Sequence, residues 1–157
     1  MAKSSGGTRN KRPEKDWYKE SQRVKAETLK IADSLKGNPM LFSTHNGIDM
    51  NLEMTKSDLK TILNKATPDN KFNAIKNKLA QDIPGFINRG EYIGWRETID
   101  GKHPESAYFA YYNRNLGAKA YLCIRKMRGG KFKPYAIINE TMFKAEIGSL
   151  RKDKPPE

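Results

Sequence analysis

The first half of the chain repeats its apolar residues at helical spacing. Residues 16–36 carry one apolar face and predict an amphipathic helix that ends at Gly37. A second helix is predicted at residues 55–65, because Thr55 and Asp58 have the spacing of a capping box ahead of an apolar stripe. This half of the chain is therefore predicted to be mainly helical.

A third helix and one short strand complete the first half. The helix is predicted to begin with Pro68 at its first position, where the missing N–H costs nothing, and to stop at Pro84. Between the first two helices, residues 40–42 predict a strand and residues 45–54 predict a loop.

After Gly90 the apolar residues recur at every second position. This alternation predicts four strands, at residues 91–97, 107–113, 119–127 and 132–139. The last two connections are short and contain glycine, as hairpins require. Helices followed by hairpin-connected strands predict an α+β fold class, with N-terminal helices packed on one face of a four-stranded antiparallel meander.

The composition divides the chain into one domain and two polar ends. Residues 1–15 have almost no apolar side chains and predict a disordered basic arm, because nothing there offsets the entropy of ordering. Residues 16–148 predict a single α+β domain, which suits a chain of 157 residues, and residues 149–157 predict a polar tail.

The single cysteine and the short apolar runs limit the classes of protein. Cys123 has no second cysteine with which to form a disulfide or a cysteine metal cluster, and we predict no cofactor. The apolar runs are far shorter than a membrane span, and the N-terminus lacks the apolar stretch of a signal peptide. These features predict a cytoplasmic protein that has no membrane partner.

The net charge of +12 is distributed unevenly along the chain. Residues 1–36 contribute +5, residues 37–113 are neutral, and residues 114–157 contribute +7. Between residues 114 and 133 there are seven basic side chains and no acidic one, which indicates a polyanionic partner. The alternative is a charged face kept for solubility, which mixed signs would serve better. The residues predicted to bind nucleic acid are Arg114, Lys119, Tyr121, Lys126, Arg128, Lys131 and Lys133.

Tyrosines accompany this basic segment on the predicted sheet. Alternation places Tyr121 and Arg125 on the face opposite the core, and the neighbouring strands carry several more tyrosines. Cations on phosphates and aromatic rings on bases are how proteins hold single-stranded nucleic acid. We expect RNA to be favoured over DNA as the partner. The alternative is that these tyrosines are half-buried strand formers.

Several short motifs and the order of the elements resemble the barnase–EndoU–colicin–RelE (BECR) superfamily of metal-independent ribonucleases, as carried by phages and mobile elements. The resemblance covers about residues 42–143. It comprises the helix Thr-Lys-x-x-Leu-Lys-x-Ile-Leu, a Tyr-Ile-Gly strand, a His-Pro loop, an Ala-Tyr-Phe-Ala-Tyr-Tyr strand, and the strands Tyr-Leu-Cys-Ile-Arg-Lys and Tyr-Ala-Ile-Ile.

The resemblance implies a catalytic site made by Lys60, His103, Arg125 and Tyr135, all predicted to converge over the sheet. Many members of the superfamily carry histidine where this chain has Lys60, and a lysine needs a lowered pKa to act as a base near neutral pH. The Gly129-Gly130 turn places Tyr135 on the face of Arg125 only if the loop adds one residue, as a bulged turn would. If Lys60 and Arg125 lay on opposite faces of the sheet, well beyond the reach of one bound phosphate, the ribonuclease would lose its site and a binding module would take its place.

Three functions remain open from the sequence. The first is a metal-independent endoribonuclease or toxin-like nuclease of a phage or mobile element, acting in the cytoplasm of a bacterial host. The second is a non-catalytic accessory protein that binds RNA or DNA on the same scaffold. The third is a structural component of a phage, located in the virion. An inhibitor or a virion component is the protein partner that these functions predict. Fold analogy alone does not separate the first two.

Overall fold

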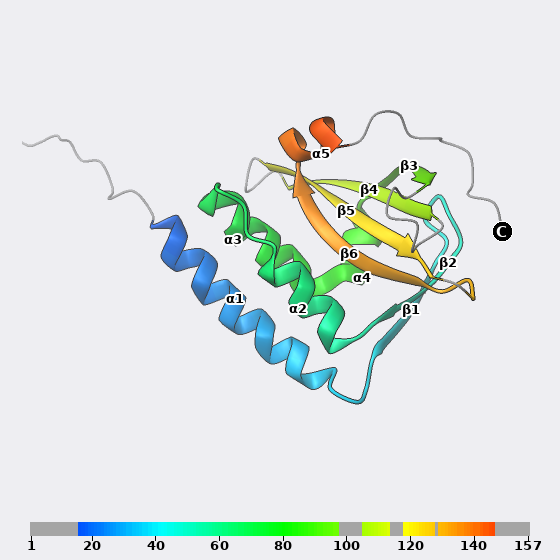
Figure 1. The fold of residues 1–157 in the computed structure, drawn as a ribbon, viewed down its shortest axis with the longest axis horizontal. Helices are drawn as coiled ribbons and strands as arrows, with labels where there is room; N and C mark the ends of the chain where they lie inside the picture. Colours follow the sequence, from blue (N-terminus) through cyan, green and yellow to red (C-terminus); the bar gives the residue numbers. More distant parts are fainter. Residues whose placement is uncertain (1–15, 98–104, 114–117, 128, 147–157) are drawn as a thin grey trace, which may run out of the picture.

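A computed structural model describes residues 16–97, 105–113, 118–127 and 129–146 of the chain (Figure 1). The predicted arm at residues 1–15 and the predicted tail at residues 149–157 lie outside these ranges.

The described helices follow the predicted order, with two additions. They are α1 (Trp17–Ser34), α2 (Lys56–Asn64), α3 (Asn70–Leu79), a 3-10 turn (Ala80–Asp82), α4 (Ile83–Arg89) and α5 (Glu140–Glu146). The capping box of α2 is confirmed, because the Thr55 hydroxyl accepts from the Asp58 amide while the Asp58 carboxylate accepts from the Thr55 amide. None of the described helices has the length and apolar character needed to cross a bilayer.

The strands form one mixed sheet. They are β1 (Met40–Thr44), β2 (Met50–Met54), β3 (Glu91–Glu97), β4 (Glu105–Asn113), β5 (Ala118–Lys126) and β6 (Phe132–Asn139), in the spatial order β1-β2-β6-β5-β4-β3. The β2–β6 pair is parallel and the other pairs are antiparallel. The α+β fold class is confirmed, and the predicted antiparallel run of four strands is present as β3 to β6. The predicted sheet was too small, because β1 and β2 extend it.

The prediction of a loop at residues 45–54 is wrong over its second half. Met50, Leu52 and Met54 are buried on one face of β2, whereas Asn51 is exposed on the other. This alternation is the pattern of a half-buried strand, although it is only five residues long. Leu52 pairs with Phe132 of β6, so β2 joins the hairpin β1–β2 to the meander.

The two proline predictions for the third helix are also wrong. Asp69 is the N-cap of α3, and Pro68 precedes it rather than occupying the first turn. Pro84 does not end a helix but lies in the first turn of α4, behind the N-cap Asp82. A first-turn residue has no intrahelical acceptor for its N–H, so proline is tolerated there. The predicted long helix is therefore divided into α3 and α4 by a 3-10 turn.

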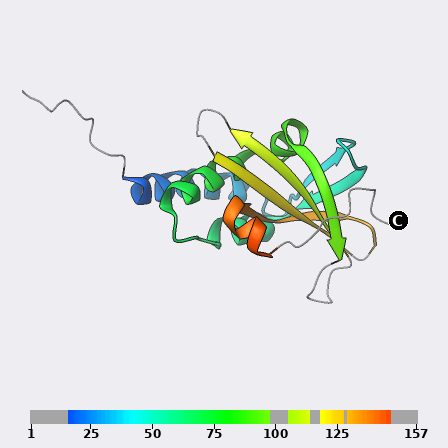
Figure 2. The ribbon, with the colours of Figure 1, turned by 90° about the horizontal axis from the view of Figure 1, so that it is seen from above.

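The helices and the sheet form layers (Figure 1). Ala120, Leu122 and Ile124 of β5 point into the main core, which α1 to α4 complete. The α1 helix packs mainly on α3, outside the layer that touches the sheet. Seen from above, α1 and α3 lie at one end of the molecule and β1 and β2 at the other (Figure 2).

The short helix α5 packs on the opposite face of the sheet. There Met142 and Phe143 lie against a second cluster of buried residues that includes Tyr121 and Cys123. The prediction that helices cover only one face is therefore wrong. No helix was predicted at the residues of α5, because a helix of seven residues carries too few apolar positions to define a helical period.

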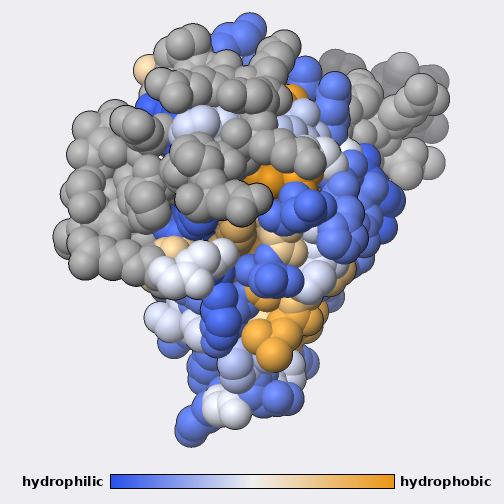
Figure 3. Space-filling model, turned by 90° about the vertical axis from the view of Figure 1, so that its right-hand side faces the viewer, coloured by the Kyte–Doolittle hydropathy of each residue, from blue (hydrophilic) through white to orange (hydrophobic). Residues whose placement is uncertain are grey.

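The end of the molecule formed by β1 and β2 is mixed in polarity. Leu41 of the edge strand β1 is 71% exposed. Figure 3, which views the molecule from this side, shows hydrophobic surface between hydrophilic areas. The described part of this end is therefore not a uniformly basic surface.

A buried lysine holds the C-terminal end of α2. Lys76 of α3 is 1% exposed, and its Nζ donates to the backbone carbonyls of Ile62 and Lys65. These carbonyls belong to the last turn of α2, where intrahelical partners run out. Burial, together with the charges of Lys25 and Lys65, lowers the pKa of Lys76 from 10.5 to about 8.

We expect Lys76 to titrate far below an ordinary lysine. The unfolded chain then binds more protons than the folded chain between about pH 8 and pH 10.5, so the contribution of Lys76 to the free energy of unfolding rises with pH across this window. The ¹³Cε shift of Lys76, followed by NMR against pH, should show a midpoint near 8. A midpoint in the ordinary range of lysine would contradict the prediction.

Candidate active site

The register of the β5–β6 hairpin places Arg125 and Tyr135 on the same face of the sheet, because Tyr135 lies two residues beyond Lys133, the partner of Arg125. Arg125 pairs with Lys133, but the register shifts between Ile124 and Cys123, so that Tyr135 is the extra residue of β6. A residue inserted into one strand changes which face the following side chains take. The predicted extra residue of the turn is thus present, since Lys126 pairs with Phe132 and Arg125 with Lys133, and the irregularity at Tyr135 is a second one within β6.

Two cations contact the ring of Tyr135. The guanidinium carbon of Arg125 lies 3.5 Å from the ring centroid, and the Nζ of Lys65 lies 3.2 Å from it. Lys65 is the C-cap of α2, the residue whose carbonyl Lys76 binds. We call Lys65, Arg125 and Tyr135 the Tyr135 cluster; each of the three residues is partly exposed.

The cluster changes the acidity of the phenol. The hydrogen bond of Lys65 to Tyr135 lowers the pKa of the phenol, and the charges of Lys65 and Arg125 act in the same direction. Partial burial opposes this shift without cancelling it. The cluster therefore combines a phenol that ionises more readily than usual with two positive groups, which is a combination suited to proton transfer beside an anionic substrate.

No family model, curated protein or solved structure matches this chain. Among the described residues, no group of three or more His, Cys, Asp or Glu side chains is placed to hold a metal ion.

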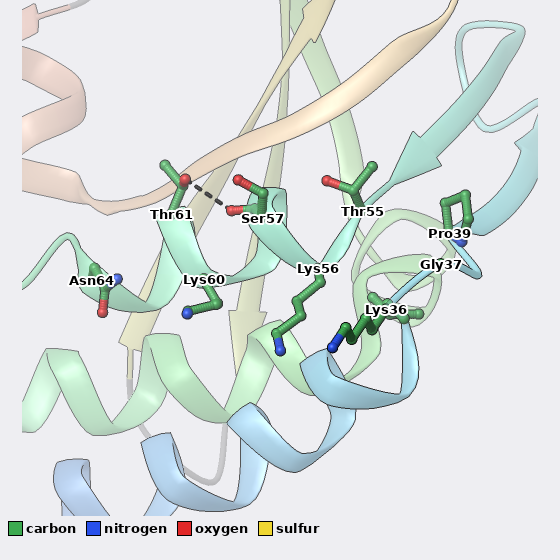
Figure 4. A pocket seen from close by; sticks show the side chains of 10 residues that line it. Lys36, Gly37, Pro39, Thr55, Lys56, Ser57, Lys60, Thr61 and Asn64 are labelled. Atoms are coloured by element: carbon green, nitrogen blue, oxygen red, sulfur yellow. Dashed lines mark hydrogen bonds between the residues drawn. The ribbon is translucent and has the colours of Figure 1, made fainter.

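Lys60 lies away from the Tyr135 cluster, so the predicted convergence is wrong for this residue. It is exposed on α2 and lines a groove against the end of α1. Figure 4 shows its side chain pointing toward α1 and away from β6. Lys60 and Lys65 are five residues apart, and five residues rotate a helix by well over one turn, so the two side chains leave α2 in different directions.

Lys65 is the site residue that the sequence analysis missed. A signal was present in the chain, since the helix was predicted to end at Lys65, which is the C-cap of α2. The bulge at Tyr135 could not be placed in β6 from the sequence, because one inserted residue leaves the composition of the strand unchanged.

The basic segment around the β5–β6 turn is partly neutralised in space. Lys131 is 3.1 Å from a carboxylate oxygen of Glu53, and Lys133 is 3.7 Å from one of Asp58. These acids come from β2 and α2, so counting charges along residues 114–133 did not reveal them. Lys119 and Lys126 lie 5.8 and 6.0 Å from the ring centroids of Tyr121 and Phe132, respectively.

Tyr121 does not present its ring to a ligand. It is 5% exposed, and its ring stacks on Phe143 of α5 at 4.0 Å with an interplanar angle of 3°. A ring covered by another ring cannot stack on a base while α5 is in place, so the predicted role of Tyr121 in binding is corrected. His103, Arg114 and Arg128, which were also predicted as site residues, lie outside the described residues.

Proposed function

We propose that this protein is a metal-independent endoribonuclease and that the Tyr135 cluster is its active site. The observation that supports the proposal is the contact of one readily ionised phenol with two cations, from α2 and β5, at a partly exposed position. The loss of Lys60 from the site removes the base that the sequence suggested. The Tyr135 phenolate takes that role in the proposal.

The reaction would be an intramolecular transesterification. The Tyr135 phenolate takes the proton of a ribose 2′-hydroxyl, and the 2′-oxygen attacks the adjacent phosphorus. The guanidinium of Arg125 offsets the charge that develops on the phosphorane oxygens. The bond to the 5′-oxygen breaks, and the ammonium of Lys65 donates a proton to that oxygen. The products are a 2′,3′-cyclic phosphate and a 5′-hydroxyl end.

The resemblance to the BECR superfamily supports the same class of reaction. That superfamily implies a basic residue on the helix before the sheet, together with basic and polar residues on the exposed sheet face. Lys65 at the end of α2, with Arg125 and Tyr135 on β5 and β6, meets this description better than Lys60 does.

Cleavage of labelled single-stranded RNA in the presence of EDTA tests the proposal. We expect products with 2′,3′-cyclic phosphate and 5′-hydroxyl ends, and no cleavage of an oligonucleotide of the same sequence that lacks the 2′-hydroxyl. Activity that EDTA abolishes, or equal cleavage of the deoxy oligonucleotide, would overturn the proposed mechanism.

The second candidate function is non-catalytic binding of RNA or DNA by a phage accessory or structural protein. The observation that favours it is the separation of Lys60 from Arg125, which leaves the Tyr135 cluster with cations for phosphate but without the predicted lysine base. A salt-sensitive mobility shift without any cleavage, under conditions where the folded protein is intact, would support this second function.

A further inference from the structure

A basic groove runs along α2 and contains no member of the Tyr135 cluster. It is a hollow of about 610 Å³ between the end of α1 and α2. Its lining residues are Leu35, Lys36, Gly37, Pro39, Thr55, Lys56, Ser57, Lys60, Thr61 and Asn64. Figure 4 shows Lys36 and Lys56 directed into the space between the two helices, with Lys60 on the same side of α2.

Positive charge dominates the groove. Asp33 is the carboxylate beside it and is 2.8 Å from the Nζ of Lys56. The hydrogen bond and charge of Lys56, with the charges of Lys60 and Lys36, lower the pKa of Asp33. Among the described residues, the ammonium groups of Lys36 and Lys60 make no hydrogen bond or ion pair. Two of the three lysines are thus available to an anion.

We propose that this groove binds backbone phosphate of the RNA strand whose cleavage the Tyr135 cluster catalyses. The ligand class is a phosphodiester, which several ammonium groups on flexible stems can follow without a fixed geometry. The inference rests on the proposed function for the identity of the strand. It does not require the chemical step, because the groove contains no member of the cluster.

The path between the two sites is short and polar. The nine residues of α2 extend about 13 Å, a length that a few nucleotides can span. Ser57, Thr61 and Asn64 are exposed along this helix and line the groove. A strand held at Lys65 can therefore pass Asn64 and Thr61 before it reaches Lys60, and Ser57 continues the polar surface beyond it.

The test compares two double variants of the full-length protein. Lys36→Gln with Lys60→Gln removes the two available ammonium groups of the groove. Lys30→Gln with Lys78→Gln removes the same charge from exposed positions on α1 and α3 outside it. Fluorescence anisotropy measures binding of 2′-O-methyl RNA of 12 and 3 nucleotides, which cannot be cleaved, at several salt concentrations.

We expect the groove variant to bind the 12-mer about tenfold more weakly at low salt and to lower its log–log salt slope by about 1.4, which is two contacts at ~0.7 each. Binding of the 3-mer, and the matched control variant with either oligonucleotide, should be unchanged. The inference would be overturned if both double variants lost the same affinity for RNA, or if the groove variant lost the same affinity for the 12-mer and the 3-mer. It would also be overturned if the groove variant bound inorganic phosphate more weakly but bound RNA as tightly as before. Loss of 12-mer binding in a protein that never cleaves RNA would support the groove and refute the nuclease.

Discussion

Tyr135→Phe is expected to lower kcat for RNA cleavage by about 100-fold or more, the usual contribution of a general base. The substitution removes only the hydroxyl and keeps the ring that Arg125 and Lys65 contact. The free energy of unfolding should therefore change little. Single-turnover cleavage of labelled RNA, with urea denaturation of the same preparation, measures both effects. Tyr121→Phe makes the same change at a buried, stacked tyrosine and is the matched control.

The pH dependence separates a base from a merely structural tyrosine. Because the active form of a base is deprotonated, kcat/KM should rise with pH through the pKa of Tyr135, which lies below the ordinary value for a phenol. Lys65→Gln removes the leading cause of that shift, so the rise should move to higher pH. An unchanged profile in Lys65→Gln would mean that Tyr135 is not the titrating base.

Lys76→Ala is expected to lower the free energy of unfolding by about 3 kcal/mol. The change deletes a buried aliphatic stem and leaves the carbonyls of Ile62 and Lys65 without their donor. Urea denaturation followed by circular dichroism measures the loss. Lys78→Ala changes an exposed lysine of the same helix and should fall within about 0.5 kcal/mol of the natural protein.

A second variant distinguishes the contribution of the aliphatic stem of Lys76 to stability from that of its ammonium group. Lys76→Met fills the space of the stem without a donor, so it should recover part of the stability lost in Lys76→Ala. RNA cleavage should nevertheless fall in both variants, because the end of α2 positions Lys65. Full activity in Lys76→Met would show that the carbonyl contact does not position the catalytic ammonium group.

Local signals in the sequence predicted the elements that depend on local interactions. The capping box fixed the start of α2, and alternation placed β3 and β6 with the bounds that the structure has. The helix end predicted at Pro84 was wrong because Asp82 caps a new helix just before it, and proline is tolerated in the first turn of a helix. The strand β2 is short, and its partner β6 is distant in sequence, so local pattern alone gave it little support.

The candidate site could be predicted only in part for the same physical reason. Arg125 and Tyr135 lie on adjacent strands, so a hairpin brings them together, and the register of the hairpin meets the stated condition of one added loop residue for a shared face. Lys65 joins them through the packing of α2 beside β6, a tertiary contact without a sequence pattern. Glu53 reaches Lys131 through tertiary structure as well. The charge stripe therefore overstated the free positive charge of the hairpin.

The parallel pairing of Leu52 with Phe132 has a consequence for biosynthesis. A polypeptide leaves the ribosome N-terminal end first, and β1, β2 and α2 are translated long before the strand that completes their core. Contacts between such distant segments form late, because closing the long loop between them costs entropy. The Tyr135 cluster depends on the same late strand. Under the proposed function, a nascent chain would therefore not cleave RNA until β6 had been synthesised and docked beside α2.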